Sequence, residues 1–198
     1  MIQQESPMPE ESPMLPQESL AVIAAAIGKT KENFRENASY FLLWGWLIAT
    51  ASGLFFLLHA YTGFRYYFLP FPVLAGAGIV GTLALYSRRK AIAHTETYLG
   101  YFFMRMWLGL GVGFIGVVAV SAARGLPPFG YTLIIAGIGT LASGLAMRFR
   151  PLTIGGVLFF ISAGVCIWMP DLYQPLVQAL AIVAGYLVPG YLLKSAPL

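Results

Sequence analysis

Six apolar stretches of about 18 to 25 residues fill the sequence between Tyr40 and Leu193, with only short polar breaks between them. An α-helix needs about this length to cross ~30 Å of hydrocarbon at ~1.5 Å per residue. The sequence therefore predicts an all-α, polytopic membrane protein with six transmembrane helices. The expected spans are Tyr40–Tyr61, Tyr66–Tyr86, Tyr98–Ala122, Phe129–Met147, Leu152–Met169 and Leu172–Leu193.

The composition agrees with a membrane protein and argues against a nucleic-acid-binding one. Hydrophobic residues make up 58% of the chain and charged residues only 10%, whereas soluble domains carry roughly 25% charged residues. The net charge is +4, but the basic residues lie in the breaks between the apolar stretches. We therefore expect these basic residues to lie near the lipid bilayer and the protein to bind no nucleic acid.

Two segments precede the first span. Residues 1–17 are rich in Pro, Glu, Ser and Gln, which predicts a disordered cytoplasmic tail. Residues 18–38 place Leu20, Ile23, Ile27 and Phe34 at helical spacing, which predicts an amphipathic juxtamembrane helix. That helix is expected to lie on the membrane surface or, alternatively, to dock a cytoplasmic protein partner. Residues 39–198 form the six-helix transmembrane domain.

The distribution of Lys and Arg predicts the orientation of the chain. With the N-terminus inside, nine basic residues fall in the inner segments and two, Arg65 and Arg124, in the outer turns. Cytoplasmic segments of membrane proteins carry such an excess, so both termini are expected in the cytoplasm.

An ungapped shift of 61 residues lays the first helical hairpin on the second. It aligns Trp46 with Trp107 and Gly78 with Gly139. Such matches indicate a parallel internal repeat, or they arise by chance because membrane segments draw on few residue types.

Gly109 and Gly113 form a GxxxG pattern in the third span. Small residues at this spacing let helix backbones approach closely, so we expect a helix-packing face here. The alternative is a set of glycines that line a pore.

Arg105 is the charged residue that lies deepest in an expected span. Near the start of its helix it can extend to the cytoplasmic headgroups while its aliphatic stem packs on lipid. The alternative is a buried ion pair with Glu96 or contact with a substrate, because intramembrane charges often mark functional sites.

Other reactive residue types do not form a recognisable site. Cys166 is the only cysteine, His59 and Asp171 could form a proton-relay pair only at the outer helix ends, and Ser143 has no histidine at its depth. The sequence therefore predicts no catalytic residue, no metal or cofactor site and no enzymatic activity.

Four sequence runs resemble a family of small bacterial membrane proteins of unknown function with six helices, associated with Bacteroidetes-type genomes. They are the start of the juxtamembrane segment with FLLWGW at 41–46, GIGTLASG at 137–144, RPLTIGG at 150–156 and GYLVPGYLLK at 185–194. The chain departs from that family in its Pro/Glu tail and in Arg105. The resemblance implies a bacterial cytoplasmic membrane and supplies no catalytic residues.

The scarcity of intramembrane charge favours a non-catalytic integral membrane protein, such as a sensor, a scaffold or an accessory subunit. A small transporter or channel, oligomeric in its working form, is the alternative.

Overall fold

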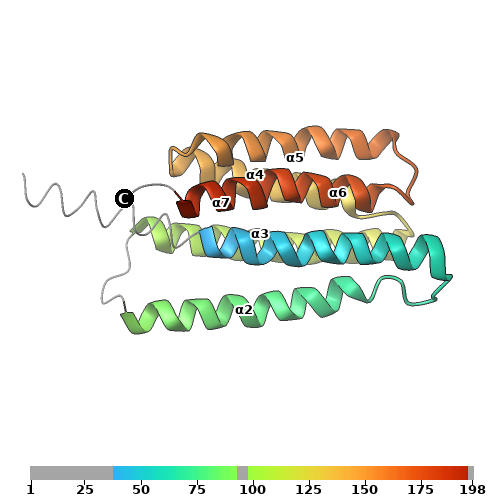
Figure 1. Cartoon of the computed structure of the whole chain (residues 1–198), viewed down its shortest axis with the longest axis horizontal. Coiled ribbons are helices and arrows are strands. Elements are labelled where there is room, and N and C mark those ends of the chain that lie inside the picture. The colour runs from blue at the N-terminus through green and yellow to red at the C-terminus, as the bar shows by residue number, and fades with distance from the viewer. Residues whose placement is uncertain (1–37, 93–97, 196–198) are drawn as a thin grey trace, which may run out of the picture.

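The computed structural model describes residues 38–92 and 98–195, and all secondary structure in these two ranges is helical (Figure 1). The first span, Ala38–Thr62, ends in the π-helical turn η1, Leu58–Thr62. It is followed by α2 (Pro70–Ile92), α3 (Tyr98–Arg124), α4 (Phe129–Ala146) and α5 (Arg150–Trp168). The last span consists of α6 (Gln174–Ile182), the π-helical turn η2 (Val183–Leu187) and α7 (Val188–Ser195). The expected tail and nearly all of the expected juxtamembrane helix lie outside the described residues.

Within the described residues, six helices are long and apolar enough to cross a membrane, as the sequence predicts. The largest change at a helix start is in the second span, where α2 begins at Pro70 rather than at Tyr66. Residues 65–69 form turns instead. Proline disfavours helical geometry in the residue before it but fits the first helical position, where its missing N–H has no intrahelical partner.

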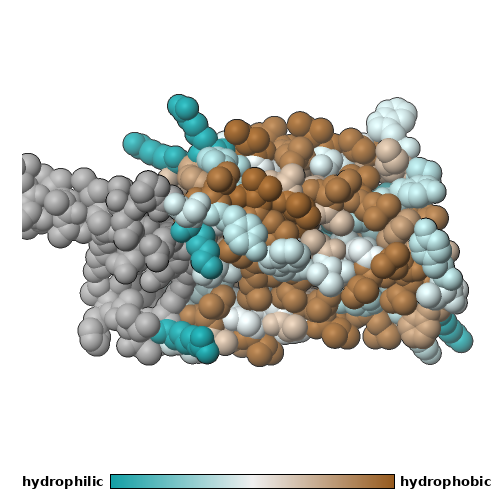
Figure 2. Space-filling view, in the orientation of Figure 1, coloured by the Kyte–Doolittle hydropathy of each residue, from teal (hydrophilic) through white to brown (hydrophobic). Residues whose placement is uncertain are grey.

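The helices run antiparallel along one common direction, so successive turns alternate between the two ends of the bundle (Figure 1). Hydrophobic residues cover the middle of the face shown in Figure 2, and hydrophilic residues gather at the ends. One end, here called the basic end, carries Arg88, Arg148, Arg150 and Lys194. Arg65 and Arg124 lie at the opposite end.

The tightest packing joins α4, α5 and the last span. A Cβ atom built on Gly144 would lie 2.5 Å from the Thr153 backbone nitrogen, and one on Gly156 would lie 2.6 Å from the Leu141 backbone nitrogen. Such approaches are possible only without a side chain, and they bring α4 and α5 together along most of their length. Phe159 of α5 and Tyr186 of η2 are both buried, and their rings meet edge to face with centroids 4.9 Å apart in the core between α5 and the last span.

Helices α2 and α3 contribute far less to this core. In each of these two helices only 6% of an apolar 18-residue stretch is buried, against 50% in α4 and in the last span. Helix α2 lies at the edge of the bundle in Figure 1 and packs on the first span. The chain thus combines a compact half with a loosely covered half.

Candidate functional site

Several polar side chains inside the apolar belt are paired with each other or with the backbone, whereas the buried Ser52 hydroxyl has no hydrogen-bond partner within the described residues. The Trp107 indole nitrogen donates to the Ser143 hydroxyl at 3.3 Å. The Thr132 hydroxyl donates to the Phe129 carbonyl at 2.9 Å and lies 3.4 Å from Oε1 of the buried Gln178. The contact of Trp107 with Ser143 joins α3 to α4, and that of Thr132 with Gln178 joins α4 to α6.

The first two hairpins share one three-residue arrangement. In the first, the Trp44 ring lies against Gly78 (a Cβ there would be 2.8 Å from Cη2), and its indole nitrogen donates to the Thr82 hydroxyl at 3.1 Å. In the second, the Trp107 ring lies against Gly139 in the same way, at 2.9 Å, and donates to Ser143. In both hairpins the hydroxyl follows the glycine by one helical turn.

This arrangement matches the two hairpins in a register that differs in part from the 61-residue shift. Gly78 and Gly139 correspond as the 61-residue shift predicts, but Trp44, rather than Trp46, is the structural equivalent of Trp107. Trp46 instead donates its indole hydrogen to the Tyr191 hydroxyl at 3.1 Å. The two hairpins run in the same direction, as a parallel repeat requires (Figure 1).

The outer faces of the two equivalent helices differ. In α4, Gly137, Thr140, Leu141 and Gly144 lie on one side, and α5 covers it: a Cβ on Gly137 would be 3.3 Å from the Gly156 carbonyl oxygen. The equivalent side of α2 consists of Gly76, Ile79, Val80 and Leu83, which we call the bare face. Thr140 is fully buried, whereas Ile79, its equivalent, is 54% exposed, and Val80 is 67% exposed.

Arg105 is an exposed residue in the second turn of α3, near the basic end. Its guanidinium carbon lies 5.0 Å from the centroid of the Tyr101 ring. This position suits a side chain at the headgroup level, and the cation–π contact orients it. Glu96, its expected alternative partner, lies outside the described residues.

Gly109 and Gly113 are exposed on α3, and no atom of the described chain lies within 4 Å of a Cβ built on either. The glycines that make close helix contacts are in other spans, for example Gly139, Gly144 and Gly155. A packing role for Gly109 and Gly113 would therefore involve a molecule other than the described part of this chain.

His59 and Asp171 have separate neighbours. The His59 ring packs on Tyr67, with centroids 4.3 Å apart, and on Phe55. The Asp171 carboxylate accepts a hydrogen bond from the Gln174 amide at 3.1 Å. Among residues 38–92 and 98–195, no three His, Cys, Asp or Glu side chains form a metal-binding group.

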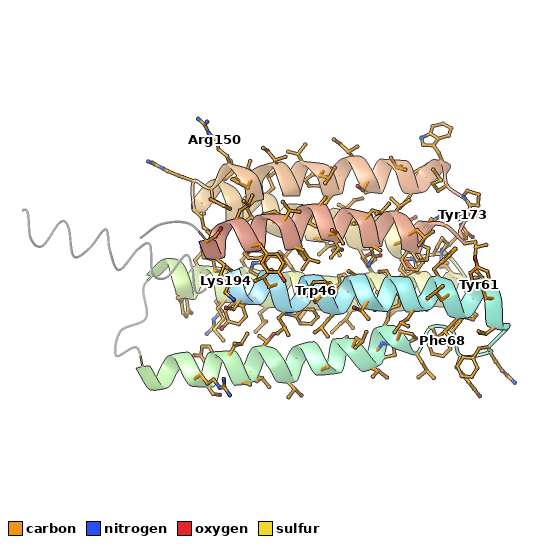
Figure 3. The ribbon with its side chains drawn as sticks, viewed as in Figure 1. Trp46, Tyr61, Phe68, Arg150, Tyr173 and Lys194 are labelled. Carbon is orange, nitrogen blue, oxygen red and sulfur yellow. The ribbon has the colours of Figure 1, made fainter. Side chains whose placement is uncertain are left out.

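A groove of about 570 Å³ opens at the basic end between the first span, α2 and α7. Most of its lining is apolar; this part, which we call the floor, includes Leu42, Leu43 and Leu47, and Arg88 and Lys194 line the groove as well. Trp46 lines it as well, held by its hydrogen bond to Tyr191 (Figure 3). Its volume is within the ~300–1,000 Å³ typical of ligand sites.

Sequence reasoning did not single out this groove, because its cations come from α2 and α7 and only the tertiary fold brings them together. The one available signal was the tryptophan in the first turns of the first span, beside a basic segment. Comparisons with known protein families, with curated proteins and with solved structures find no match.

Proposed function

We propose that this protein is a non-catalytic accessory subunit or scaffold of a membrane assembly, and that the bare face of α2 binds a transmembrane helix of a different membrane protein. The proposal includes a bacterial cytoplasmic membrane with both termini in the cytoplasm, as the basic-residue distribution and the family resemblance suggest.

The single observation that carries this proposal is the difference between the two equivalent hairpins. The same side of the helix is covered by α5 in the second hairpin and uncovered in the first. Exposed apolar residues alone would be ordinary in a bilayer, because lipid covers them. Gly76 adds a specific reason, since it occupies the position of Gly137, at which a helix approaches to backbone contact.

A glycine on a lipid-facing position lowers helix propensity and gains nothing in packing. On a helix interface it permits close van der Waals contact, which drives helix association where the hydrophobic effect is absent. The hydrogen bonds that join helices through Trp107 and Ser143 and through Thr132 and Gln178 also support a structural role over a catalytic one.

Site-specific photocrosslinking in native membranes tests this proposal. A benzophenone amino acid at Val80 should form one discrete adduct with another membrane protein, with a fixed stoichiometry of the two proteins. The same group at Leu180, an equally exposed apolar position on α6, serves as the control and should give only lipid adducts. Gly76→Leu should abolish the Val80 adduct without changing the thermal stability of the purified chain.

Three results would contradict the proposal. Lipid adducts alone at Val80 would mean that the bare face is a lipid face. An adduct of two identical chains would assign the face to self-association. Solute or ion flux above that of protein-free vesicles, measured with the purified protein, would favour the transporter or channel alternative.

A further inference from the structure

The groove at the basic end has the chemistry of an amphiphile site. Its floor is formed by leucines of the first span and small residues of α2, among them Gly81 and Ala84. Arg88 and Lys194 also line it, and Lys194 lies at the basic end of the bundle in Figure 3. We propose that this groove binds one anionic glycerophospholipid, with its phosphate on Arg88 and Lys194 and an acyl chain along the leucine floor.

The charge of the site points to an anion. Among the described residues, no acidic side chain lines the groove. Asp171, the one Asp or Glu in the described ranges, lies at the opposite end of the bundle. Arg88 offers a planar guanidinium that can hold two phosphate oxygens, and Lys194 adds a compact second charge.

The position of the site points to a lipid rather than to a soluble anion. Trp46, 55% exposed, and Tyr191 lie beside the groove and hydrogen-bond to each other. Tryptophan and tyrosine favour the headgroup level, where one side of the ring is apolar and the other meets water. Basic sites between helices at this level are the usual places where anionic headgroups bind.

The shape of the groove follows from two close contacts of the first span. A Cβ on Gly81 would lie 2.9 Å from a Leu43 methyl group, and one on Gly190 would lie 3.0 Å from a Leu42 methyl group. These glycines hold α2 and α7 on either side of the first span. The groove uses a different side of α2 from the bare face, so the two proposals can fail independently.

Native mass spectrometry of the full-length protein in detergent tests the site. Added phosphatidylglycerol should give one adduct that persists at activation energies that strip phosphatidylcholine. The double variant Arg88→Gln/Lys194→Gln should weaken phosphatidylglycerol binding by about tenfold or more, because each cation near a headgroup contributes to affinity. Ala84→Trp fills the floor and should weaken binding without altering charge.

The control is Arg148→Gln/Arg150→Gln, which removes the same charge at the same end. Neither residue lines the groove, and Arg150 lies on α5, away from Lys194 (Figure 3). An unchanged melting temperature without added lipid establishes that each variant is folded.

Several outcomes would overturn the proposal. Equal losses in the two double variants would mean that lipid responds only to the overall charge of this end. Equal retention of phosphatidylcholine would remove the role of the anion. Displacement of the adduct by millimolar glycerol phosphate would assign the site to a soluble phosphate ester. The lack of a phosphatidylglycerol adduct on the full-length protein, together with an adduct after deletion of residues 1–17, would mean that the acidic tail occupies the groove.

Discussion

Gly155 of α5 and Gly185 of η2 meet backbone to backbone: a Cβ atom on Gly155 would lie 2.6 Å from the Gly185 carbonyl oxygen. Tyr186, next to Gly185, then places its ring among Phe41, Phe159 and Trp107. The first span, α3, α5 and the last span thus converge on one tyrosine. The contact between the two glycines fixes how deeply that ring enters the core.

The first prediction is that Gly155→Ala destabilises the protein. The added methyl group meets backbone atoms that cannot move aside as a flexible side chain would, and overpacking of this kind costs about 1–3 kcal/mol. Gly164→Ala in the same helix is the matched control, because no atom lies within 4 Å of a Cβ there. Thermal unfolding in detergent should show a lowered midpoint for the first variant and an unchanged or raised one for the second. Equal midpoints would mean that α5 and η2 are not in contact.

The second prediction compares two buried serines. Ser143→Ala removes the acceptor of the Trp107 indole and should lower the free energy of unfolding by about 0.5–2 kcal/mol. Ser52 is fully buried, and its hydroxyl has no hydrogen-bond partner within the described residues. Ser52→Ala removes an unsatisfied hydroxyl and should leave stability unchanged or raise it by up to ~1 kcal/mol. A loss on Ser52→Ala as large as that on Ser143→Ala would reveal a partner for Ser52.

The third prediction concerns the exposed glycines of α3. Gly109→Leu and Gly113→Leu should leave the melting temperature of the detergent-solubilised monomer unchanged, because both positions are open. Gly139→Leu is the contrasting variant. A Cβ there would lie 2.7 Å from a Leu110 methyl group and 2.9 Å from the Trp107 ring, so a strong loss of stability is expected. If Gly109→Leu destabilises the monomer as much as Gly139→Leu, α3 is covered by the rest of the chain.

The fourth prediction is that Arg105 tolerates replacement. Arg105→Lys and Arg105→Gln should both express and melt like the unaltered protein, because an exposed cation over Tyr101 contributes at most about 1 kcal/mol. A drop of several degrees in Arg105→Gln that Glu96→Gln rescues would instead establish a buried ion pair. That result would favour the transporter alternative, because buried intramembrane charges mark functional sites.

The fifth prediction is the orientation of the bundle. Reporter fusions after Lys90, Arg150 and Lys194 should be cytoplasmic, and those after Thr62, Leu126 and Pro170 should be external. The expected pattern follows from the basic residues at one end of the helices. Reversal at any two of these points would contradict it.

The six helices could be predicted from the sequence alone, because span length and apolar composition are local properties that no tertiary contact needs to support. The sequence also predicts which turns lie at the same end of the bundle, because successive spans cross in opposite directions. The basic residues of alternate turns are therefore expected together at one end. The start of α2 at Pro70 also has a local cause, the restriction that proline places on the residue before it. The prediction from apolar composition placed this start at Tyr66, because the apolar residues continue without a break from there to Pro70.

Which glycines make helix contacts could not be predicted from the sequence and depends on how the helices pack. Gly109 and Gly113 match the GxxxG pattern and are open, whereas Gly144, Gly155 and Gly156 touch the backbone of a neighbouring helix. Spacing along one helix says which residues share a face, but not which helix lies opposite that face. The equivalence of Trp44 with Trp107 and the groove between Arg88 and Lys194 also depend on which helices lie opposite each other. Each is formed by side chains of different helices, whose relative rotation is set by packing over the whole bundle.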